Sequence, residues 1–212
     1  MIPLSRLLAW CLVIPGLLVP TFAQIPARTA NWSVDVGLDS YSERQGLVVS
    51  PNGPVHLRGY LTGDQRLPAI RTFQPTTGQL LWEYVAAAPV NFGTSQNHLA
   101  VSADGTLFTH LGSRIFAFEG VTGRIRWQFD LESDVSRFGI GADGTLYVEA
   151  ISRIHAFNPE TGMVRWSHQS EAVFEAPFVI APNGNLYYAA YNGTAPLSGV
   201  WSLDPGPGTE LG

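Results

Sequence analysis

Few side chains in this sequence stand in a pattern that catalysis or cofactor binding requires. Gly139, Gly141 and Gly144 in "GIGADG" satisfy the spacing GxGxxG, which binds the pyrophosphate of a dinucleotide when a strand precedes it and a helix follows it. Here the next residues, "TLYVEA", have the composition of a strand, and a related segment carries Ala100 and Ser102 in place of the first two glycines. We therefore interpret the motif as part of a hairpin, not as a dinucleotide site.

The titratable side chains are scattered along the chain. No histidine pair has the ligand spacing HxH or HxxxH among His56, His98, His110, His155 and His168. His155 takes a strand position held by Phe116 in a related segment, so we expect a packed or rim histidine and not a metal ligand. The acidic residues examined as acid–base candidates are also single: Glu149, Glu160, Glu171 and Glu175. With no GxSxG motif either, we predict no catalytic, cofactor-binding or metal-binding residues, no cofactor, and a protein that is not an enzyme.

The composition excludes further classes of function. Among 212 residues there is one cysteine and no lysine, and 12 arginines against 17 acidic residues give a net charge of −5. Without lysine the chain can form neither a Schiff base nor the phosphate loop GxxxxGK[ST]. An acidic chain without a basic stripe binds nucleic acid poorly, so we expect no nucleic-acid partner.

The first residues have the pattern of a secretory signal. Arg6 precedes an apolar run from Leu7 to Val19, and small residues stand before a cleavage site at Gln24. The run is shorter than the roughly 20 residues that span a bilayer. We predict a signal peptide over 1–23, a mature chain without a transmembrane span, and a periplasmic or secreted bacterial protein. The cysteine lies in this leader, so a hydrophobic core and not a disulfide must hold the mature fold.

The mature chain is built from repeats of about forty residues. The pattern TGxxxW occurs three times, ending at Trp82, Trp127 and Trp166, which are 45 and 39 residues apart. A second marker, Asn-Gly or Asp-Gly, recurs with its glycine at Gly53, Gly105, Gly144 and Gly184. Units of this length made of four short strands are typical of propeller blades.

Each repeat contains the signals of four strands. In one unit these are "HLAVS", "TLFTHL", "SRIFAF" and "RIRWQFD", and the Asp-Gly between the first two predicts a type I′ hairpin with positive φ at both residues. No apolar stripe of period 3.6 is present in the mature chain. The sequence predicts an all-β fold, a β-propeller of four-stranded antiparallel blades with about four repeats present.

The repeats resemble those of the pyrroloquinoline-quinone-like (PQQ-like) β-propeller family. "AFNPETGMVRW" is similar to the tryptophan-docking motif AxDxxTGxxxW, "AFEGVTGRIRW" matches with Glu119 at the Asp position, and "TFQPTTGQLLW" is a looser copy with Thr72 and Gln74 in place of Ala and Asp. The resemblance covers about residues 32–212. It implies that each tryptophan packs on the turn of a neighbouring blade, where its N–H needs a carbonyl partner.

The repeats define the expected domains. Residues 24–45 form an N-terminal segment with a possible ring-closing strand at 32–36, where Trp32 stands like an outer-strand tryptophan. The repeats follow over 46–212, at about 46–85, 97–130, 137–169 and an incomplete 176–212. Family rings are implied to close with six to eight blades, so we expect an incomplete ring whose remaining blades are missing from this chain.

Two functions remain open. The first is an exported, non-catalytic scaffold that binds a protein or ligand, as the outer-membrane-assembly propellers of the family do. The alternative is a fragment of a quinoprotein dehydrogenase, whose resemblance implies a calcium ion, eight blades and commonly a vicinal disulfide. This mature chain has no cysteine for such a disulfide, and nothing in the sequence indicates a converging quinone site, so we favour the scaffold.

Binding in such a scaffold is expected at the loops that connect strands. These are the connections from outer to inner strands and from second to third strands, at about 37–45, 86–96, 131–136, 170–175, 61–67 and 191–197. Thr62–Arg66 and Tyr191–Gly199 depart most from the repeat, and departures of this kind mark either a partner surface or a tolerated insertion.

Overall fold

The computed structural model describes residues 30–38, 46–51, 53–63, 67–89, 99–170, 173–174, 177–191 and 198–206. The chain divides into Met1–Ala30, of which only Ala30 is described, and Asn31–Gly212, which contains every strand. All regular elements in the described ranges are β-strands, and no helix there is long and apolar enough to cross a membrane. The expected signal peptide and its cleavage site lie outside the described residues.

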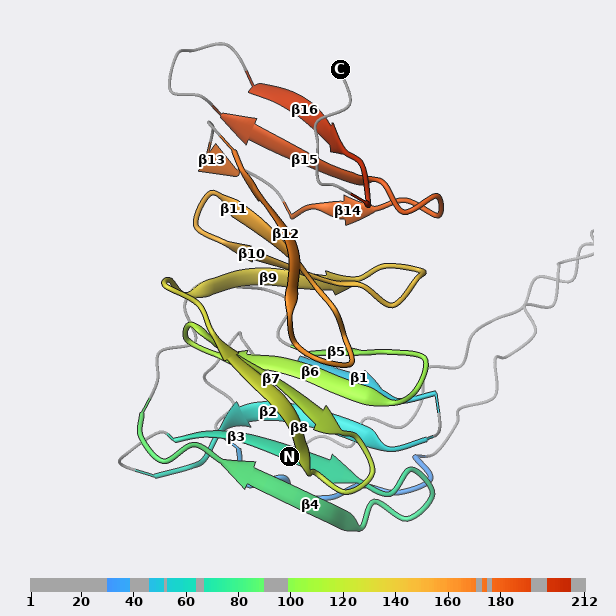
Figure 1. Ribbon diagram of the computed structural model, residues 1–212. Helices are drawn as coiled ribbons and strands as arrows, with labels where there is room; N and C mark the ends of the chain where they lie inside the picture. Colours follow the sequence, from blue (N-terminus) through green and yellow to red (C-terminus); the bar gives the residue numbers. More distant parts are fainter. Residues whose placement is uncertain are drawn as a thin grey trace, which may run out of the picture. The chain divides into compact units, whose positions relative to one another are not determined.

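Within the described ranges sixteen strands form four antiparallel sheets, and their arrows are labelled in Figure 1. The first sheet contains β1 (Gly46–Val49), β2 (Val55–Tyr60), β3 (Pro68–Phe73) and β4 (Leu80–Val85). The second contains β5 (Leu99–Val101), β6 (Thr106–Leu111), β7 (Arg114–Glu119) and β8 (Ile125–Asp130). The third contains β9 (Val135–Ile140), β10 (Leu146–Ala150), β11 (Arg153–Phe157) and β12 (Val164–Gln169). In all three the strands pair in chain order.

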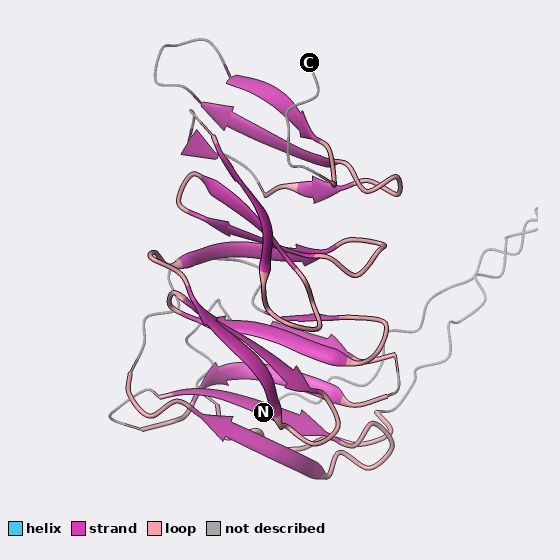
Figure 2. Ribbon diagram, in the orientation of Figure 1, coloured by secondary structure: helices cyan, strands magenta, loops and turns pink. Residues whose placement is uncertain are grey.

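The fourth sheet contains β13 (Val173–Phe174), β14 (Val179–Ile180), β15 (Leu186–Tyr191) and β16 (Ser198–Leu203). Its first two strands both pair with β15, β14 near Leu186 and β13 near Tyr191. Together they stand where a single inner strand stands in the other sheets. The all-β propeller architecture is thus confirmed. Figure 2 shows strands and loops, and no helix, in the described residues.

The hairpins between first and second strands differ in type from the expectation. Type I′ requires positive φ at both central residues, but of Asp104 and Gly105 only the glycine has it, with a φ of 84°. The Gly105 N–H donates to the Ser102 carbonyl at 2.9 Å and the Ser102 N–H donates to the Thr106 carbonyl at 3.0 Å. This is a type I turn followed by a left-handed glycine, which needs one more residue than type I′. The prediction of type I′ was therefore wrong, and the hairpin itself is present.

The aspartates of these hairpins have a structural role. In the second sheet the Asp104 carboxylate accepts from the Thr106 N–H at 3.1 Å and from Arg126 of β8 at 2.7 Å. Burial acts to raise the pKa of Asp104, but the hydrogen bonds from Ser102, Arg126 and Thr106 hold it well below its usual range. The hairpin end of the sheet is thereby tied to its outer strand.

The tryptophans dock between consecutive sheets as the family resemblance implies. Trp82 donates its indole N–H to the Gly120 carbonyl at 2.9 Å, and Trp127 donates to the Pro159 carbonyl at 2.8 Å. Within its own sheet each tryptophan lies directly opposite the small residue of the motif, such as Ala117 opposite Trp127. A small side chain at that position leaves the ring free to reach the next sheet.

Apolar side chains fill the space between consecutive sheets. One cluster joins the first sheet to the second, a second cluster joins the second to the third, and a third joins the third to the fourth. The innermost strands β1, β5, β9 and β14 are neighbours in that order. Among the described residues no cluster joins the fourth sheet to the first, so the sheets form an open series and not a closed ring.

The segment before the first sheet takes the place of a preceding outer strand without being one. Residues 32–37 form no strand, and Leu38 makes only an isolated bridge with Leu61. Trp32 nevertheless donates its indole N–H to the Pro75 carbonyl at 2.8 Å, as the other docking tryptophans do. Val36 and Leu38 pack with the first sheet's own apolar cluster. The free face of the first sheet is thus partly covered by this segment.

Candidate binding site

Two kinds of connection meet at the same end of the second and of the third sheet. The loop after the outer strand of the second sheet lies against its turn between second and third strands, where the Leu131 N–H donates to the Ser113 carbonyl at 3.0 Å. The same contact recurs in the third sheet between Ser170 and Ser152, at 2.9 Å. We call this the loop end; the Asp-Gly hairpins and the TG turns lie at the opposite end.

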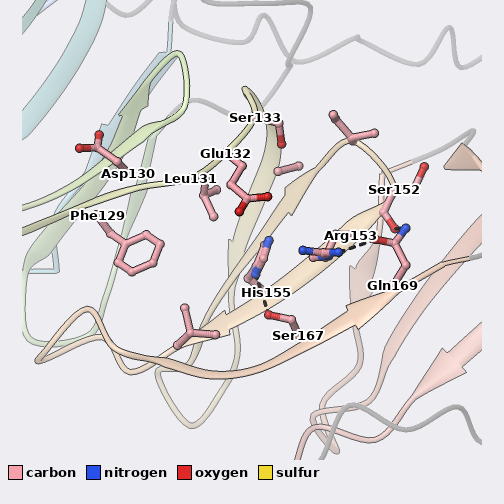
Figure 3. A pocket seen from close by; sticks show the side chains of 13 residues that line it. Phe129, Asp130, Leu131, Glu132, Ser133, Ser152, Arg153, His155, Ser167 and Gln169 are labelled. Atoms are coloured by element: carbon pink, nitrogen blue, oxygen red, sulfur yellow. Dashed lines mark hydrogen bonds between the residues drawn. The ribbon is translucent and has the colours of Figure 1, made fainter.

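A pocket of about 520 Å³ lies at the loop end between the second and third sheets. Figure 3 shows its walls: the end of β8, the β8–β9 loop, the β10–β11 turn and the strands β11 and β12. Its polar lining comes from Asp130, Glu132, Ser133, Ser152, Arg153, His155, Ser167 and Gln169. Its apolar lining comes from Phe129, Leu131, Ala150, Ile151 and Val164. The volume is in the range of small-ligand sites.

Cross-strand hydrogen bonds fix the polar side chains on the floor of the pocket. His155 on β11 and Ser167 on β12 are directly opposed, and the His155 Nδ1 and Ser167 Oγ are 2.7 Å apart. Arg153 and Gln169 form the next opposed pair on that face, with the Arg153 Nε donating to the Gln169 Oε1 at 3.0 Å. These residues are therefore held in place before any ligand binds.

Arg153 lacks the acidic partner that its counterpart in the second sheet, Arg114, has. There Arg114 binds Asp130 through two hydrogen bonds, Nε to Oδ1 at 2.5 Å and an η nitrogen to Oδ2 at 2.9 Å, and the pKa of Asp130 is lowered by them. In the third sheet the opposed residue is the neutral Gln169, and Arg153 makes no ion pair with a described residue. Arg153 thus brings to the pocket a positive charge that no directly opposed carboxylate neutralises.

The other titratable groups of the pocket are His155 and Glu132. Burial lowers the pKa of His155, Arg153 lowers it further, and Glu132 opposes both. The imidazole is therefore neutral near pH 7. In Figure 3 the Glu132 carboxylate points toward His155 from the rim, while Asp130 points away from it.

Ile151 at the rim of the pocket has a strained backbone. Its φ is 53°, and it alone among the described non-glycine residues has a positive φ. A β-branched residue in this region is a conformational outlier, and backbone strain of this kind clusters at functional sites. The side chain is also 70% exposed. In the second sheet the same turn position is Gly112, with a φ of 61° and no such strain.

The remaining residues singled out in the sequence have structural surroundings. The "GIGADG" segment is the end of β9 and its hairpin. His56 is buried between Ser50 and Thr72, with ring nitrogens 2.7 and 2.8 Å from their hydroxyl oxygens. Glu149 is buried against Arg137 at 3.0 Å; burial raises its pKa and Arg137 opposes this.

Two further histidines also have packing roles. His168 lies 3.0 Å from the Tyr188 hydroxyl, and the His110 ring packs edge-on against Phe138. Glu160 lies in the TG turn of the third sheet, where its N–H donates to the Asn158 side chain at 2.9 Å. No three metal-ligating side chains gather anywhere in the described ranges. His98, Glu171 and Glu175 lie outside those ranges.

Of the loops expected to bind, 131–136 is fully described and its first three residues line the pocket. Most of the other five expected loops lies outside the described residues, including 39–45, 64–66, 90–96, 171–172 and 192–197. Sequence reasoning did not identify three residues that line the pocket, namely Ile151, Arg153 and Gln169. A position-by-position comparison of the second and third repeats contains that signal, since Gly112 and Asp130 are replaced by Ile151 and Gln169.

The sheet order, the inter-sheet tryptophans and the open series of blades define a β-propeller of PQQ-like repeats. A family model described as outer membrane protein assembly factor BamB matches residues 68–209. The chain belongs to this family. No curated protein sequence matches it significantly.

Solved structures show the same fold at low sequence identity. BamB from Moraxella catarrhalis is 18% identical with a TM-score of 0.56, over 76% of this chain and 46% of that one. The dihydro-heme d1 dehydrogenase NirN is 15% identical with a TM-score of 0.59, over 80% and 36%. A europium-containing methanol dehydrogenase is 11% identical with a TM-score of 0.54, over 74% and 39%. The chain therefore spans less than half the length of each of these proteins.

Proposed function

We propose that this chain is an exported, non-catalytic β-propeller that binds a protein partner through the loop end of its blades. The observation that carries the proposal is the pocket between the second and third sheets, which residues of the β8–β9 loop line. Loops held by a rigid sheet scaffold are common binding elements. Membership of a family described by an outer membrane protein assembly factor supports a protein partner in the cell envelope.

Site-directed photo-crosslinking in a Gram-negative host tests this proposal. A crosslinking side chain placed at Ser133, at the loop end, is expected to capture a defined envelope protein. The matched control is Val121, which is exposed in the TG turn at the opposite end. Equal capture from both positions, or none from Ser133 while the protein is exported and folded, would count against a loop-end partner.

Activity measurements test the non-catalytic part separately. The purified protein is incubated with pyrroloquinoline quinone and calcium, and dye reduction is followed with alcohols and sugars as substrates. We expect no turnover above that of the free quinone. Turnover that depends on the folded protein would support the quinoprotein dehydrogenase alternative instead.

A further inference from the structure

The pocket is lined by residues at which the third repeat departs from the second. Three lining residues differ in kind from their counterparts in the second sheet: Ile151 for Gly112, His155 for Phe116 and Gln169 for Asp130. The strand registers of the two sheets are otherwise the same, including the bulge opposite the docking tryptophan. The differences therefore change the surface chemistry without changing the fold.

The replacement of Phe116 by His155 opens space. Phe116 packs at 5.6 Å against Tyr84 of the preceding sheet and belongs to the apolar cluster there. His155 is smaller, and its Nδ1 is held by Ser167 within its own sheet. The ring thus leaves unfilled the volume that an aromatic side chain occupies one repeat earlier, with Phe129 and Leu131 as one apolar wall.

The replacement of Asp130 by Gln169 leaves a cation in that space. Gln169 accepts one hydrogen bond from the Arg153 Nε but carries no charge to neutralise the guanidinium. Its own amide is engaged by the Ser152 carbonyl at 3.1 Å, which fixes the side chain. A held guanidinium in a pocket that also has an apolar wall matches a carboxylate on an apolar stem, because the terminal guanidinium nitrogens donate to both carboxylate oxygens in a fork geometry.

We propose that this pocket binds a carboxylate group carried on a short apolar stem, with Arg153 contacting the carboxylate and Phe129 and Leu131 contacting the stem. A free branched-chain acid and an acidic side chain in a peptide both present this chemistry. The inference deepens the proposed function by naming what the loop end recognises; it rests on that function for the role of the binding, whereas the pocket itself places the site. Ile151, strained and exposed at the rim, covers the stem from the solvent side.

Glu132 sets the selectivity of the site. Its carboxylate makes no hydrogen bond or ion pair with a described residue, and it points to His155 at the rim. An anion bound at Arg153 shares the pocket with this negative charge, which weakens binding. Glu132→Gln is therefore expected to tighten the binding of a carboxylate, by up to about ten-fold.

Ligand-observed NMR on the purified full chain tests the proposal with four probes. These are 4-methylvalerate, its neutral amide, the blocked peptide Ac-Leu-Asp-Leu-NH₂ and its Asn analogue. We expect at least one acidic probe to bind and its neutral analogue not to bind. Binding of 4-methylvalerate identifies a free acid as sufficient, whereas binding of the Asp peptide alone identifies the peptide as the source. Equal binding of acid and amide, or no binding of either acidic probe, would overturn the proposal.

Variants that restore the residues of the second sheet make the test specific. Gln169→Asp is expected to neutralise Arg153 and His155→Phe to narrow the pocket, so each should weaken acid binding at least ten-fold. Both residues occur at these positions in the second sheet, so the variants are expected to fold, as checked by circular dichroism. Arg124→Gln, which follows the TG turn at the opposite end of the second sheet and whose partner Glu119 does not line the pocket, is the control that should leave binding unchanged. Unaltered binding in folded Gln169→Asp would refute the role of Arg153.

The probes do not require a protein partner, so this test and the crosslinking test fail independently. Capture at Ser133 without acid binding leaves the scaffold function in place and removes the carboxylate site. Acid binding without any capture retains the site and removes the protein partner.

Discussion

Trp127 of the second sheet lies against Gly162 of the third, and its indole N–H donates to the Pro159 carbonyl two residues before the TG turn at 2.8 Å. A Cβ at Gly162 would stand 2.6 Å from the indole Cδ2. The same relation holds for Trp82 with Gly123 and for Trp32 with Gly78. The glycine of the motif is therefore required both by its positive φ and by the ring of the preceding blade.

Gly162→Ala is expected to destabilise the protein much more than Gly144→Ala. Both glycines have positive φ, 72° and 84°, so either alanine costs about 1–2 kcal/mol of backbone energy. At Gly144 the nearest atom is 3.9 Å from the added Cβ, whereas at Gly162 the clash adds about 1–3 kcal/mol. Urea unfolding measures the difference; equal losses would show that the docked ring can move aside at little cost.

Trp32→Ala is expected to release the segment that covers the first sheet. The variant loses the hydrogen bond to Pro75 and the contact with Gly78, which help to hold a segment whose only strand pairing among the described residues is the bridge of Leu38 with Leu61. Chymotrypsin should then cleave after Leu38 faster than in the wild type. Val34→Ala, in the same segment but exposed, should leave the cleavage rate unchanged. Similar rates in all three proteins would mean that Trp32 does not anchor the segment.

Much of the fold could be predicted because two short motifs that recur in the repeats each indicate a specific structural feature. TGxxxW marks the docking contact, and Asp-Gly marks the hairpin, since both need a particular backbone or a particular neighbour. The turn type was wrong because Asp-Gly fits two hairpin geometries, and the Asp104 side chain selects one by accepting from the Thr106 N–H.

The candidate site was harder to predict for a physical reason. A pocket is space left between two packed sheets, and its volume depends on both walls. His155 was recognised as replacing an aromatic residue, but the charge left on Arg153 depends on the residue directly opposite, Gln169. That pairing follows from strand register, which the sequence indicates only roughly. The strain at Ile151 likewise needs the observed φ of 53°.

Ile154→Ala and Val200→Ala are expected to differ strongly in their effect on stability. The two residues occupy the same position in the third and fourth sheets, opposite Glu149 and Ala189. Ile154 is 0% exposed because the fourth sheet covers it, whereas Val200 is 77% exposed. The buried substitution should cost about 2–5 kcal/mol and the exposed one under about 0.5 kcal/mol.

Thermal or urea unfolding of these two variants provides the measurement. A large loss at Val200 would show that another part of the protein, or a second copy, covers the face of the fourth sheet in solution. Sedimentation at two concentrations would separate these cases, because only association between copies depends on concentration.

The buried histidine of the first sheet is expected to make stability fall in mildly acidic solution. Burial lowers the pKa of His56 from 6.5 to about 4, so in that interval the unfolded chain binds a proton that the folded chain does not. Stability from this residue is therefore complete above pH 6.5 and is lost as the pH falls toward 4. A shift of this size corresponds to up to about 3 kcal/mol.

His56→Gln separates this effect from the protonation of carboxylates. The variant loses the ring contacts with Ser50 and Thr72, so it should be less stable than the wild type at pH 8. Its stability should nevertheless depend less on pH between 6.5 and 4, because no imidazole at this position takes up a proton. Urea unfolding of both proteins at half-unit steps of pH gives the two slopes. Parallel curves would show that His56 does not remain neutral in the folded protein and would remove it as the cause of acid destabilisation.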